Sequence, residues 1–326
     1  MAVYVNTNYS ALQGQRYLGN VQNQLTTTYQ RLSSGMRINS AKDDAAGLQI
    51  ADRLTSQING LNQGNRNASD GIALAQTIES GMDEISGMLQ KMRTLTVQAA
   101  NGTNTMSDRQ ALGKEMTSLA NEINRIATST TFAGKTVLNG VGADSIYGKA
   151  AGGPGGNAQD GDKTKAGSTG TMTLQVGSNK GDTIAFDVNS VMFSKLGIPD
   201  AIMTKNGDKI FKVDDGVVTV QLSKANFGTA NDPLYIGAVI DALDTAIASI
   251  DGQRANLGAI QNRLESSIRN QSNVAANEAD ARSRIRDADF AEESANLSQQ
   301  SIIQQAAASM LMQANTRPQL GLSLLG

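Results

Sequence analysis

Paired carboxylates are the side chains of this sequence that come closest to a reactive or metal-binding arrangement. Asp43 and Asp44 are adjacent, Asp287 and Asp289 lie two positions apart, and Asp160-Gly161-Asp162 resembles the beginning of a calcium loop. Neighbouring carboxyl groups can share a proton in acid–base catalysis, and carboxylate oxygens are the ligands that calcium and magnesium prefer. A catalytic dyad or a cation site is therefore the most specific interpretation of each group.

The flanking residues favour plainer roles for the first two groups. Asp43-Asp44 follows Lys42 directly before a predicted helix, where acidic side chains stabilise the helix N-terminus. The Asp287/Asp289 pair lies beside Arg284 and Arg286, which we expect to be its ion-pair partners. We therefore interpret both groups as structural.

The acidic loop and a glycine-rich loop lack the remaining residues of the sites they resemble. Asp160-Gly161-Asp162 has neither the further oxygen ligands nor the closing Glu of a calcium loop. Gly152-Gly153-Pro154-Gly155-Gly156 lacks the Gly-Lys-Ser/Thr ending of a phosphate-binding loop. The chain also contains no Cys and no His, which removes disulfides, thiolate metal sites and the commonest general base. We therefore expect a protein that is not an enzyme and holds no metal or cofactor.

Composition favours self-association over binding to polyanions. The net charge of -2 offers no basic field for nucleic acid or anionic lipid, and nearly neutral copies repel one another only weakly. Aromatic residues make up 4% of the chain and Trp is absent, which suits thin helical bundles better than a thick core. No apolar run is long enough to span a bilayer, and residues 1–20 lack the basic and apolar regions of a cleaved signal. We expect a cytosolic protein, or one exported by a route that recognises some feature of the chain other than a cleaved signal peptide.

The N-terminal part of the chain has the hydrophobic period of long helices. From about residue 39 to 126, apolar residues recur in alternating steps of four and three, and we predict one helix over residues 44–100. Residues 101–104 (Asn-Gly-Thr-Asn) predict a helix end, and Ser107 is the expected N-cap of a second helix that packs antiparallel on the first. The packing stripes of these two helices contain Ile78, Met82, Ile85, Leu89, Met92, Leu112, Met116, Leu119 and Ile123.

The C-terminal part returns to the helical period after Pro233. Its first helix is predicted over residues 236–268, with polar members of the stripe at Arg254 and Gln261. The apolar members used for packing are Leu243, Ile247, Ile250, Leu257 and Leu264. A further helix is predicted from about residue 288 to 313. Because a helix with an apolar stripe is unstable alone, the first and last parts of the chain must come together.

The two ends of the chain carry matching apolar stripes. These stripes contain Leu18, Val21, Leu25, Leu32, Leu297, Ile303, Ala307, Met310, Leu311 and Ala314. Residues 1–35 and 288–326 are rich in Gln, Asn and Ser and only weakly apolar, so we expect them to become ordered only on assembly. Their stripes are then unsatisfied in a single molecule and covered by neighbouring copies.

A β-rich insert separates the helical parts, over about residues 141–231. Apolar residues alternate at 174–176 and 184–188, on either side of the turn-like segment 177–182, and Asp214-Asp215-Gly216 predicts a second hairpin. The predicted fold is therefore mainly α with a β-rich insert. It is a long antiparallel helical coiled-coil bundle formed by the N- and C-terminal segments, with a small central β region.

Three runs of residues resemble the signature sequences of bacterial flagellins. They are residues 30–48 (QRLSSGMRINSAKDDAAGL), residues 256–264 (NLGAIQNRL), and residues 281–291 (ARSRIRDADFA) with the later Gln304-Gln305-Ala306 and the closing Leu322-Ser323-Leu324-Leu325. The resemblance covers about the first 140 and the last 95 residues, in the same order and at both ends. The insert looks short for the family.

This resemblance implies a structural subunit that polymerises into the helical flagellar filament used for motility, outside the cell. It implies an inner tube built from residues 1–43 and 281–326, a surrounding rod layer built from residues 44–140 and 232–280, and an insert at 141–231 that faces the medium. The implied partners are copies of the chain itself, the flagellar export apparatus, a secretion chaperone, and cap and junction proteins, with no nucleic acid and no membrane insertion. A hook–filament junction protein of the same apparatus is the alternative, and an adapter or adhesin with a recognition insert is a third class.

One further patch is implied by the resemblance. Gln90, Lys91, Arg93, Leu95 and Glu115 match, position by position, the patch by which flagellins of this type are recognised by the animal innate receptor for flagellin, although Lys91 stands where the family often has Arg. The alternative is that these residues are solvated or contact neighbouring subunits.

Overall fold

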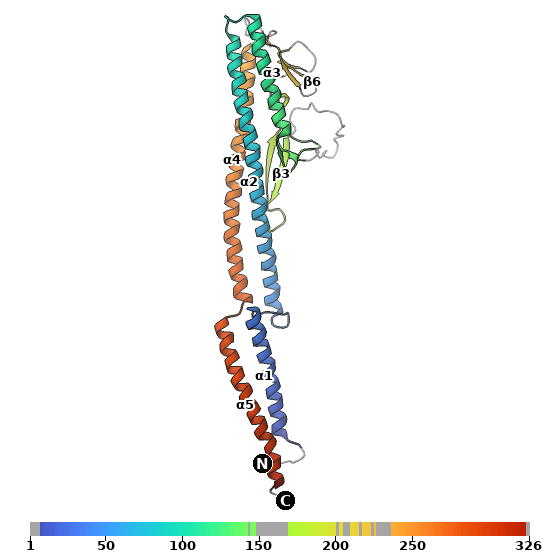
Figure 1. Cartoon of the computed structure of the whole chain (residues 1–326), viewed down its shortest axis with the longest axis vertical. Helices are drawn as coiled ribbons and strands as arrows, with labels where there is room; N and C mark the ends of the chain where they lie inside the picture. The colour runs from blue at the N-terminus through green and yellow to red at the C-terminus, as the bar shows by residue number, and fades with distance from the viewer. Residues whose placement is uncertain are drawn as a thin grey trace. The chain divides into compact units, whose positions relative to one another are not determined.

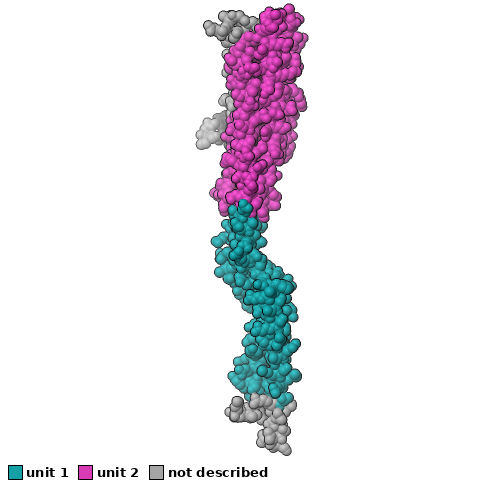
Figure 2. Space-filling view, turned by 90° about the vertical axis from the view of Figure 1, so that its left-hand side faces the viewer, with its two compact units in different colours: residues 1–60, 273–326 teal, residues 61–272 magenta. Residues whose placement is uncertain are grey.

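The computed structural model describes residues 7–142, 144–147, 169–199, 202–204, 209–214, 217–222, 225 and 236–323. Contacts divide the chain into two compact units, coloured differently in Figure 2. Unit 1 contains residues 1–60 and 273–326, and unit 2 contains residues 61–272. Within the described residues the fold is mainly helical with small central sheets, as the sequence predicted.

Unit 1 pairs the two ends of the chain. Helices α1 (Tyr9–Ser34) and α5 (Phe290–Ser323) lie side by side in Figure 1. The side chain of Asn8 caps α1 by accepting a hydrogen bond from the Ala11 N–H at 3.1 Å. Gly35 ends the helix in the left-handed conformation, with φ of 70°. Thr28 donates to Gln300 and, further along, Gln304 donates to Gln22, which makes the pair antiparallel.

Unit 2 is built around α2 (Ala45–Ala100), α3 (Met106–Ser129) and α4 (Ile236–Arg286), the first and last of which continue into unit 1. Predicted polar members of the α4 stripe find polar partners on α2. Arg254 pairs with Asp83 at 2.9 Å, and Gln261 donates to Glu79 at 2.9 Å. Because Asp83 follows Glu79 while Arg254 precedes Gln261, α2 and α4 run antiparallel.

The start of α3 differs from the prediction. Thr105, and not Ser107, is the N-cap, and it forms a capping box with Asp108. The Thr105 hydroxyl accepts from the Asp108 N–H, while the Asp108 carboxylate accepts from the Thr105 N–H at 2.9 Å. The hydrogen bonds that Asp108 accepts from the Thr105 side chain and backbone lower the pKa of this carboxyl group. Ser107 cannot take part in this exchange because it already lies inside the helix.

The predicted helix over residues 236–268 is too short. In the structure α4 continues to Arg286, and α5 starts at Phe290 after a short break. Residues 269–286 have few bulky apolar side chains, so the periodicity fades there although the helix does not end. An isolated bridge between Met36 and Asp287 joins the segments that follow α1 and α4, and both residues belong to unit 1.

The central region contains three small sheets in the described residues. Strand β1 (Thr131–Phe132) pairs with β2 (Lys135–Thr136), and β3 (Thr169–Gln175) pairs with β4 (Thr183–Asn189), both antiparallel. Strand β6 (Phe211–Asp214) pairs antiparallel with β7 (Val217–Val220), which confirms the second hairpin. Strand β5 (Met203–Thr204) adds to β6 in parallel, a pairing that the sequence did not predict.

Glycines on α2 let the β3–β4 hairpin approach the helix closely. A β-carbon at Gly64 would overlap the carbonyl oxygen of Val176, and one at Gly71 would overlap the side chain of Leu174. Gly87 lies on the same helix with open space around it. Two of the α2 glycines therefore have a packing role that a third one lacks.

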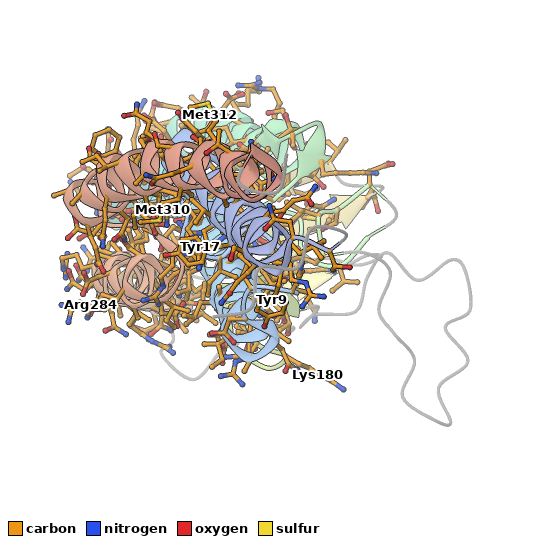
Figure 3. The ribbon with its side chains drawn as sticks, turned by 90° about the horizontal axis from the view of Figure 1, so that it is seen from below. Tyr9, Tyr17, Lys180, Arg284, Met310 and Met312 are labelled. Carbon is orange, nitrogen blue, oxygen red and sulfur yellow. The ribbon has the colours of Figure 1, made fainter. Side chains whose placement is uncertain are left out.

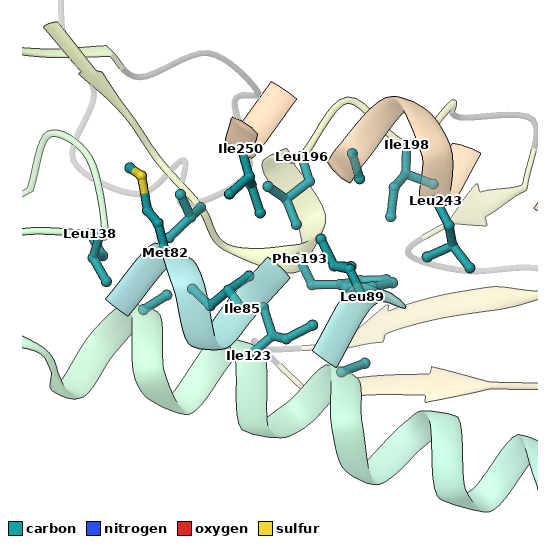
Figure 4. Packing of buried hydrophobic residues seen from close by; sticks show 14 of the residues in the cluster. Met82, Ile85, Leu89, Ile123, Leu138, Phe193, Leu196, Ile198, Leu243 and Ile250 are labelled. Atoms are coloured by element: carbon teal, nitrogen blue, oxygen red, sulfur yellow. The ribbon is translucent and has the colours of Figure 1, made fainter. Parts of the chain in front are cut away.

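The core of unit 2 takes its largest side chains from the central region. Phe193, in the short 3-10 helix η1 (Phe193–Lys195), and Phe211 in β6 are completely buried, with ring centroids 5.2 Å apart. Figure 4 shows Phe193 among apolar side chains of the cluster that also contains Leu89 and Ile123. The buried Asn124 side chain accepts a hydrogen bond from the Phe193 N–H at 2.9 Å. The insert thus belongs to the core, which the expectation of a thin helical bundle did not include.

Candidate functional site

The carboxylates nearest the start of α2 have local structural partners. Asp43 accepts from the backbone N–H groups of Ser40 and Asn39, at 2.9 and 3.1 Å. These two bonds, in this order, are the main causes that lower the pKa of Asp43. Asp44 accepts from the Gly47 N–H at 2.9 Å and so satisfies one of the free backbone donors in the first turn of α2. Both groups shape the entry to a helix.

The ion pairs predicted for the second carboxylate group are wrong. Asp287 accepts from the Ser283 hydroxyl at 2.6 Å, and Asp289 caps α5 by accepting from the Ala291 N–H at 2.8 Å. Arg284 pairs with Asp280 at 3.0 Å instead. The reason is the break between α4 and α5, which places Asp289 at a helix start where backbone donors are free.

Two loops that the sequence predicts to be incomplete as ligand sites lie in a part of the chain that the structure does not describe. The Gly152–Gly156 loop and Asp160-Gly161-Asp162 lie outside the described residues, as do Asp215, Gly216 and the closing Leu324-Leu325. In the described part of the chain, no group of three or more carboxylates is placed to hold a metal ion. No helix in that part is long and apolar enough to cross a membrane.

Large apolar side chains are exposed on both helices of unit 1. Phe290 and Ile302 are each 67% exposed, and Met310 is 70% exposed. Figure 3 shows Tyr9 and Tyr17 on α1 and Met310 and Met312 on α5. The set, called here the unit 1 apolar surface, contains Tyr9, Leu12, Tyr17, Tyr29, Phe290, Ile302, Met310 and Met312. So many exposed apolar residues on one helix pair are typical of a surface that another molecule covers.

The predicted terminal stripes lie mostly elsewhere, between the two helices. Val21, Leu25 and Ala307 are buried within a single chain. Leu18, Leu32, Leu297, Ile303, Leu311 and Ala314 are half-buried, and Met310 is exposed. The expectation that these stripes are unsatisfied in one molecule is therefore wrong for Val21, Leu25 and Ala307, because α1 and α5 cover one another. The sequence method followed the seam and missed Tyr17, Tyr29 and Ile302, which are apolar residues off the seam.

The predicted packing stripes of the longer helices lie in the core of unit 2. Most of their members are buried, namely Ile78, Met82, Ile85, Leu89, Met92, Met116, Ile123, Leu243, Ile250, Leu257 and Leu264. Leu112, Leu119 and Ile247 are half-buried and pack against the same cluster. These side chains are used within the chain and are not free to contact another copy.

Comparison with known proteins assigns the family. Residues 5–143 match the model of the bacterial flagellin N-terminal helical region, and residues 240–325 match that of the bacterial flagellin C-terminal helical region. Together the two matches cover more than half of the chain and contain all of α1, α2, α3 and α5. The chain belongs to the bacterial flagellin family. As a flagellin it is an extracellular, non-enzymatic structural subunit of the filament used for motility.

Relatives of this flagellin match it from end to end. Flagellin A of Vibrio anguillarum is 40% identical over 382 aligned positions, and flagellin A of Vibrio cholerae is 37% identical over 405, with all of both chains covered in each case. The alignments are longer than the 326 residues of this chain, so these relatives carry residues that it lacks. Full-length similarity to flagellins decides against the junction-protein alternative.

The fold is shared more widely within the flagellum. A solved structure from Vibrio parahaemolyticus, assigned to the hook-associated class, has a TM-score of 0.52 and 17% identity, and the match covers 75% of this flagellin and all of that chain. At this identity the likeness shows the fold alone.

The predicted receptor patch is held by ion pairs between helices. Lys91 pairs with Glu115 at 2.8 Å, and Arg93 contacts both carboxylate oxygens of Asp244, at 2.5 and 3.1 Å. The hydrogen bond and the charge of Asp244 raise the pKa of Arg93. Gln90 is exposed, whereas Leu95 is only 7% exposed and lies in the core cluster. Asp244 is a member of this patch that sequence reasoning missed.

Proposed function

We propose that subunits of this flagellin join one another through α1 and α5, with the unit 1 apolar surface covered by neighbouring copies. The observation that carries the proposal is the exposure of eight large apolar side chains on this helix pair. Burying one such side chain contributes about 1.5–3 kcal/mol, so several together can hold a polymer. The seam between α1 and α5 keeps the pair together, and the remaining apolar side chains face outward.

The proposal extends to the layers of the filament. Residues 1–43 and 281–326 form the inner tube, residues 44–140 and 232–280 form the rod layer, and residues 141–231 face the medium. This arrangement is supported by the division of apolar surface, since the rod stripes are buried inside one chain while α1 and α5 expose the unit 1 apolar surface beside their own shared seam. Head-to-tail contacts, in which one surface of a subunit binds a different surface of the next and the rotation does not close a ring, then generate a helical fibre.

Seeded polymerisation of an Ile302→Gln variant tests the proposal. Gln is nearly as good a helix former as Leu or Arg, so α5 is expected to remain helical, but the apolar contribution of Ile302 is lost. We expect elongation on wild-type seeds to slow by about tenfold, the effect of at least 1.4 kcal/mol. Electron microscopy of fibre length over time gives the rate.

The matched control is Val217→Gln, which changes another exposed apolar residue, on β7 in the central region. This variant is expected to elongate as the wild type does. The proposed role of α5 would be contradicted if Ile302→Gln elongates at the wild-type rate, or if both variants elongate equally slowly.

The remaining partners are further parts of the proposal. Export through the flagellar apparatus, binding of a secretion chaperone, and contacts with cap and junction proteins are supported by membership of the family, because a filament subunit must be delivered and then held at both ends of the fibre. The absence of Cys agrees with delivery of an unfolded chain, since no disulfide can form before export.

Recognition by the animal innate receptor is proposed for Gln90, Lys91, Arg93 and Glu115, which are exposed on unit 2. Leu95 is expected to support this patch from the core and not to contact the receptor. Replacing Arg93 and Glu115 with Ala is expected to reduce receptor signalling by the soluble subunit. Undiminished signalling in a cell reporter assay would leave these residues with the alternative role, as solvated or subunit-contact residues.

A further inference from the structure

Asparagine followed by glycine is the dipeptide most prone to spontaneous deamidation, and this chain contains it at residues 59–60, 101–102, 139–140 and 206–207. In this reaction the glycine nitrogen attacks the carboxamide carbon of asparagine and ammonia leaves. The resulting succinimide then adds water and opens to aspartate or isoaspartate. The local structure decides which asparagine can reach the cyclic intermediate. The first three pairs are described in the structure, and the fourth lies outside the described residues.

The turn between α2 and α3 leaves Asn101 and Gly102 open to this reaction. Both residues are exposed, and a β-carbon at Gly102 would meet no atom within 4 Å. Within the described part of the chain, no hydrogen-bond acceptor is recorded for the Gly102 N–H. The nitrogen that must attack is therefore neither covered nor engaged.

The Asn101 side chain is also turned toward the backbone that follows it. Its carboxamide oxygen accepts from the Thr103 N–H at 3.4 Å, which is an Asx-turn contact. This contact directs the carboxamide group toward the residues that follow Asn101. The reacting groups are thus neighbours in sequence and exposed, and the carboxamide points along the turn in the direction of Gly102.

The other two described pairs are held by regular structure or by the core. Asn59 and Gly60 lie well inside α2, where the helical backbone engages the glycine nitrogen and fixes its direction. Asn139 follows the buried Leu138, whose carbonyl accepts from the Val191 N–H at 3.0 Å, and Gly140 is itself buried. Ring closure at either place requires local opening of packed structure.

We propose that Asn101 is a site of non-enzymatic deamidation and that it reacts faster than Asn59 and Asn139 in the folded subunit. The reaction consumes one water, releases one ammonia, and needs no enzyme or oxidant. It places a new carboxylate just beyond the C-terminus of α2, where the helix dipole disfavours negative charge. In the isoaspartate product the main chain runs through the former side chain, so the Asn101 carbonyl leaves the main chain and the two hydrogen bonds that it accepts, from the Asn104 N–H and from the Arg109 side chain, are altered. Since no repair step is part of the reaction, the converted fraction rises with the age of the subunit.

Trypsin separates the three sites, so one experiment compares them. Cleavage after Lys and Arg places Asn101 in the peptide of residues 94–109, Asn59 in 54–66 and Asn139 in 136–149. The full-length protein is incubated at mildly alkaline pH, and conversion of each peptide from amide to acid is followed by mass spectrometry. In the native protein we expect conversion in 94–109 to be at least about tenfold faster than in the other two, because each of those sites must first open local structure worth about 1.4 kcal/mol or more, which corresponds to a factor of about ten.

Two controls assign the effect to structure and to this residue. In concentrated denaturant the three peptides are expected to convert at similar rates, because each carries the same dipeptide. The Asn101→Gln variant is expected to lose the fast conversion in 94–109, although Asn104 remains in that peptide. Equal native rates at the three sites, or fast conversion that persists in Asn101→Gln, would overturn the proposal.

Discussion

Replacing Phe193 with alanine is expected to lower the free energy of unfolding by about 3–5 kcal/mol, the range for removing a large buried ring. Phe193 has no exposed surface, and its ring contacts that of Phe211 inside unit 2. The variant leaves a cavity lined by side chains from helices and strands, which cannot all move inward together. Urea denaturation of the full-length subunit, followed by far-UV circular dichroism, measures the change.

Phe290 provides the matched control for this substitution. It is 67% exposed on α5, so Phe290→Ala is expected to change the free energy of unfolding by less than about 0.5 kcal/mol. The same chemical change is thereby made once in the core and once on the surface. Comparable destabilisation by both variants would show that the central region does not form the core described here.

Gly64→Ala is expected to destabilise unit 2 although alanine favours the helix. The added β-carbon would meet the carbonyl oxygen of Val176 and approach the Gln271 side chain at 3.1 Å. A backbone oxygen cannot rotate away as a side chain can, so the β3–β4 hairpin must shift. Such overpacking costs about 1–3 kcal/mol, against a helix-propensity gain of at most about 1 kcal/mol.

The same substitution at Gly87 is expected to change the free energy of unfolding in the opposite direction. Gly87 is exposed in the same helix with nothing within 4 Å of the added carbon, so alanine should stabilise the subunit by about 0.5–1 kcal/mol. Thermal unfolding of both variants gives the comparison, and hydrogen exchange of β4 amides reports on the hairpin. An increase of the melting temperature by Gly64→Ala would contradict the close approach of the hairpin.

The helices could be predicted because their apolar side chains repeat over many turns. A stripe such as Ile78, Met82, Ile85 and Leu89 indicates both the helix and its buried face, and all four residues are completely buried. Helix ends were harder to predict, since they depend on single reciprocal contacts. At α3 the Thr105–Asp108 exchange decided the start, and Ser107 was an equally acceptable residue type.

Contacts between distant segments could not be read from periodicity. The need for glycine at 64 and 71 arises only from the place where the β3–β4 hairpin packs on α2. The ion pair between Arg93 and Asp244 joins residues 151 positions apart, and the sequence around either residue contains no pattern that identifies the other as its partner. Tyr17, Tyr29 and Ile302 of the unit 1 apolar surface were missed for a related reason, because they lie off the stripe that periodicity follows and are exposed after α1 and α5 have paired.

The pairing of α1 with α5 constrains when a subunit can finish folding. Asn8 donates to the Ala314 carbonyl, 306 positions away, and Arg31 pairs with Glu293, 262 positions away. Contacts of such long range form late, because the intervening chain must first be brought together. The terminal helix pair therefore cannot be completed until the final segment of the chain is present. Broken or prematurely ended chains would lack this pair and, with it, the surface proposed above to join one copy to the next.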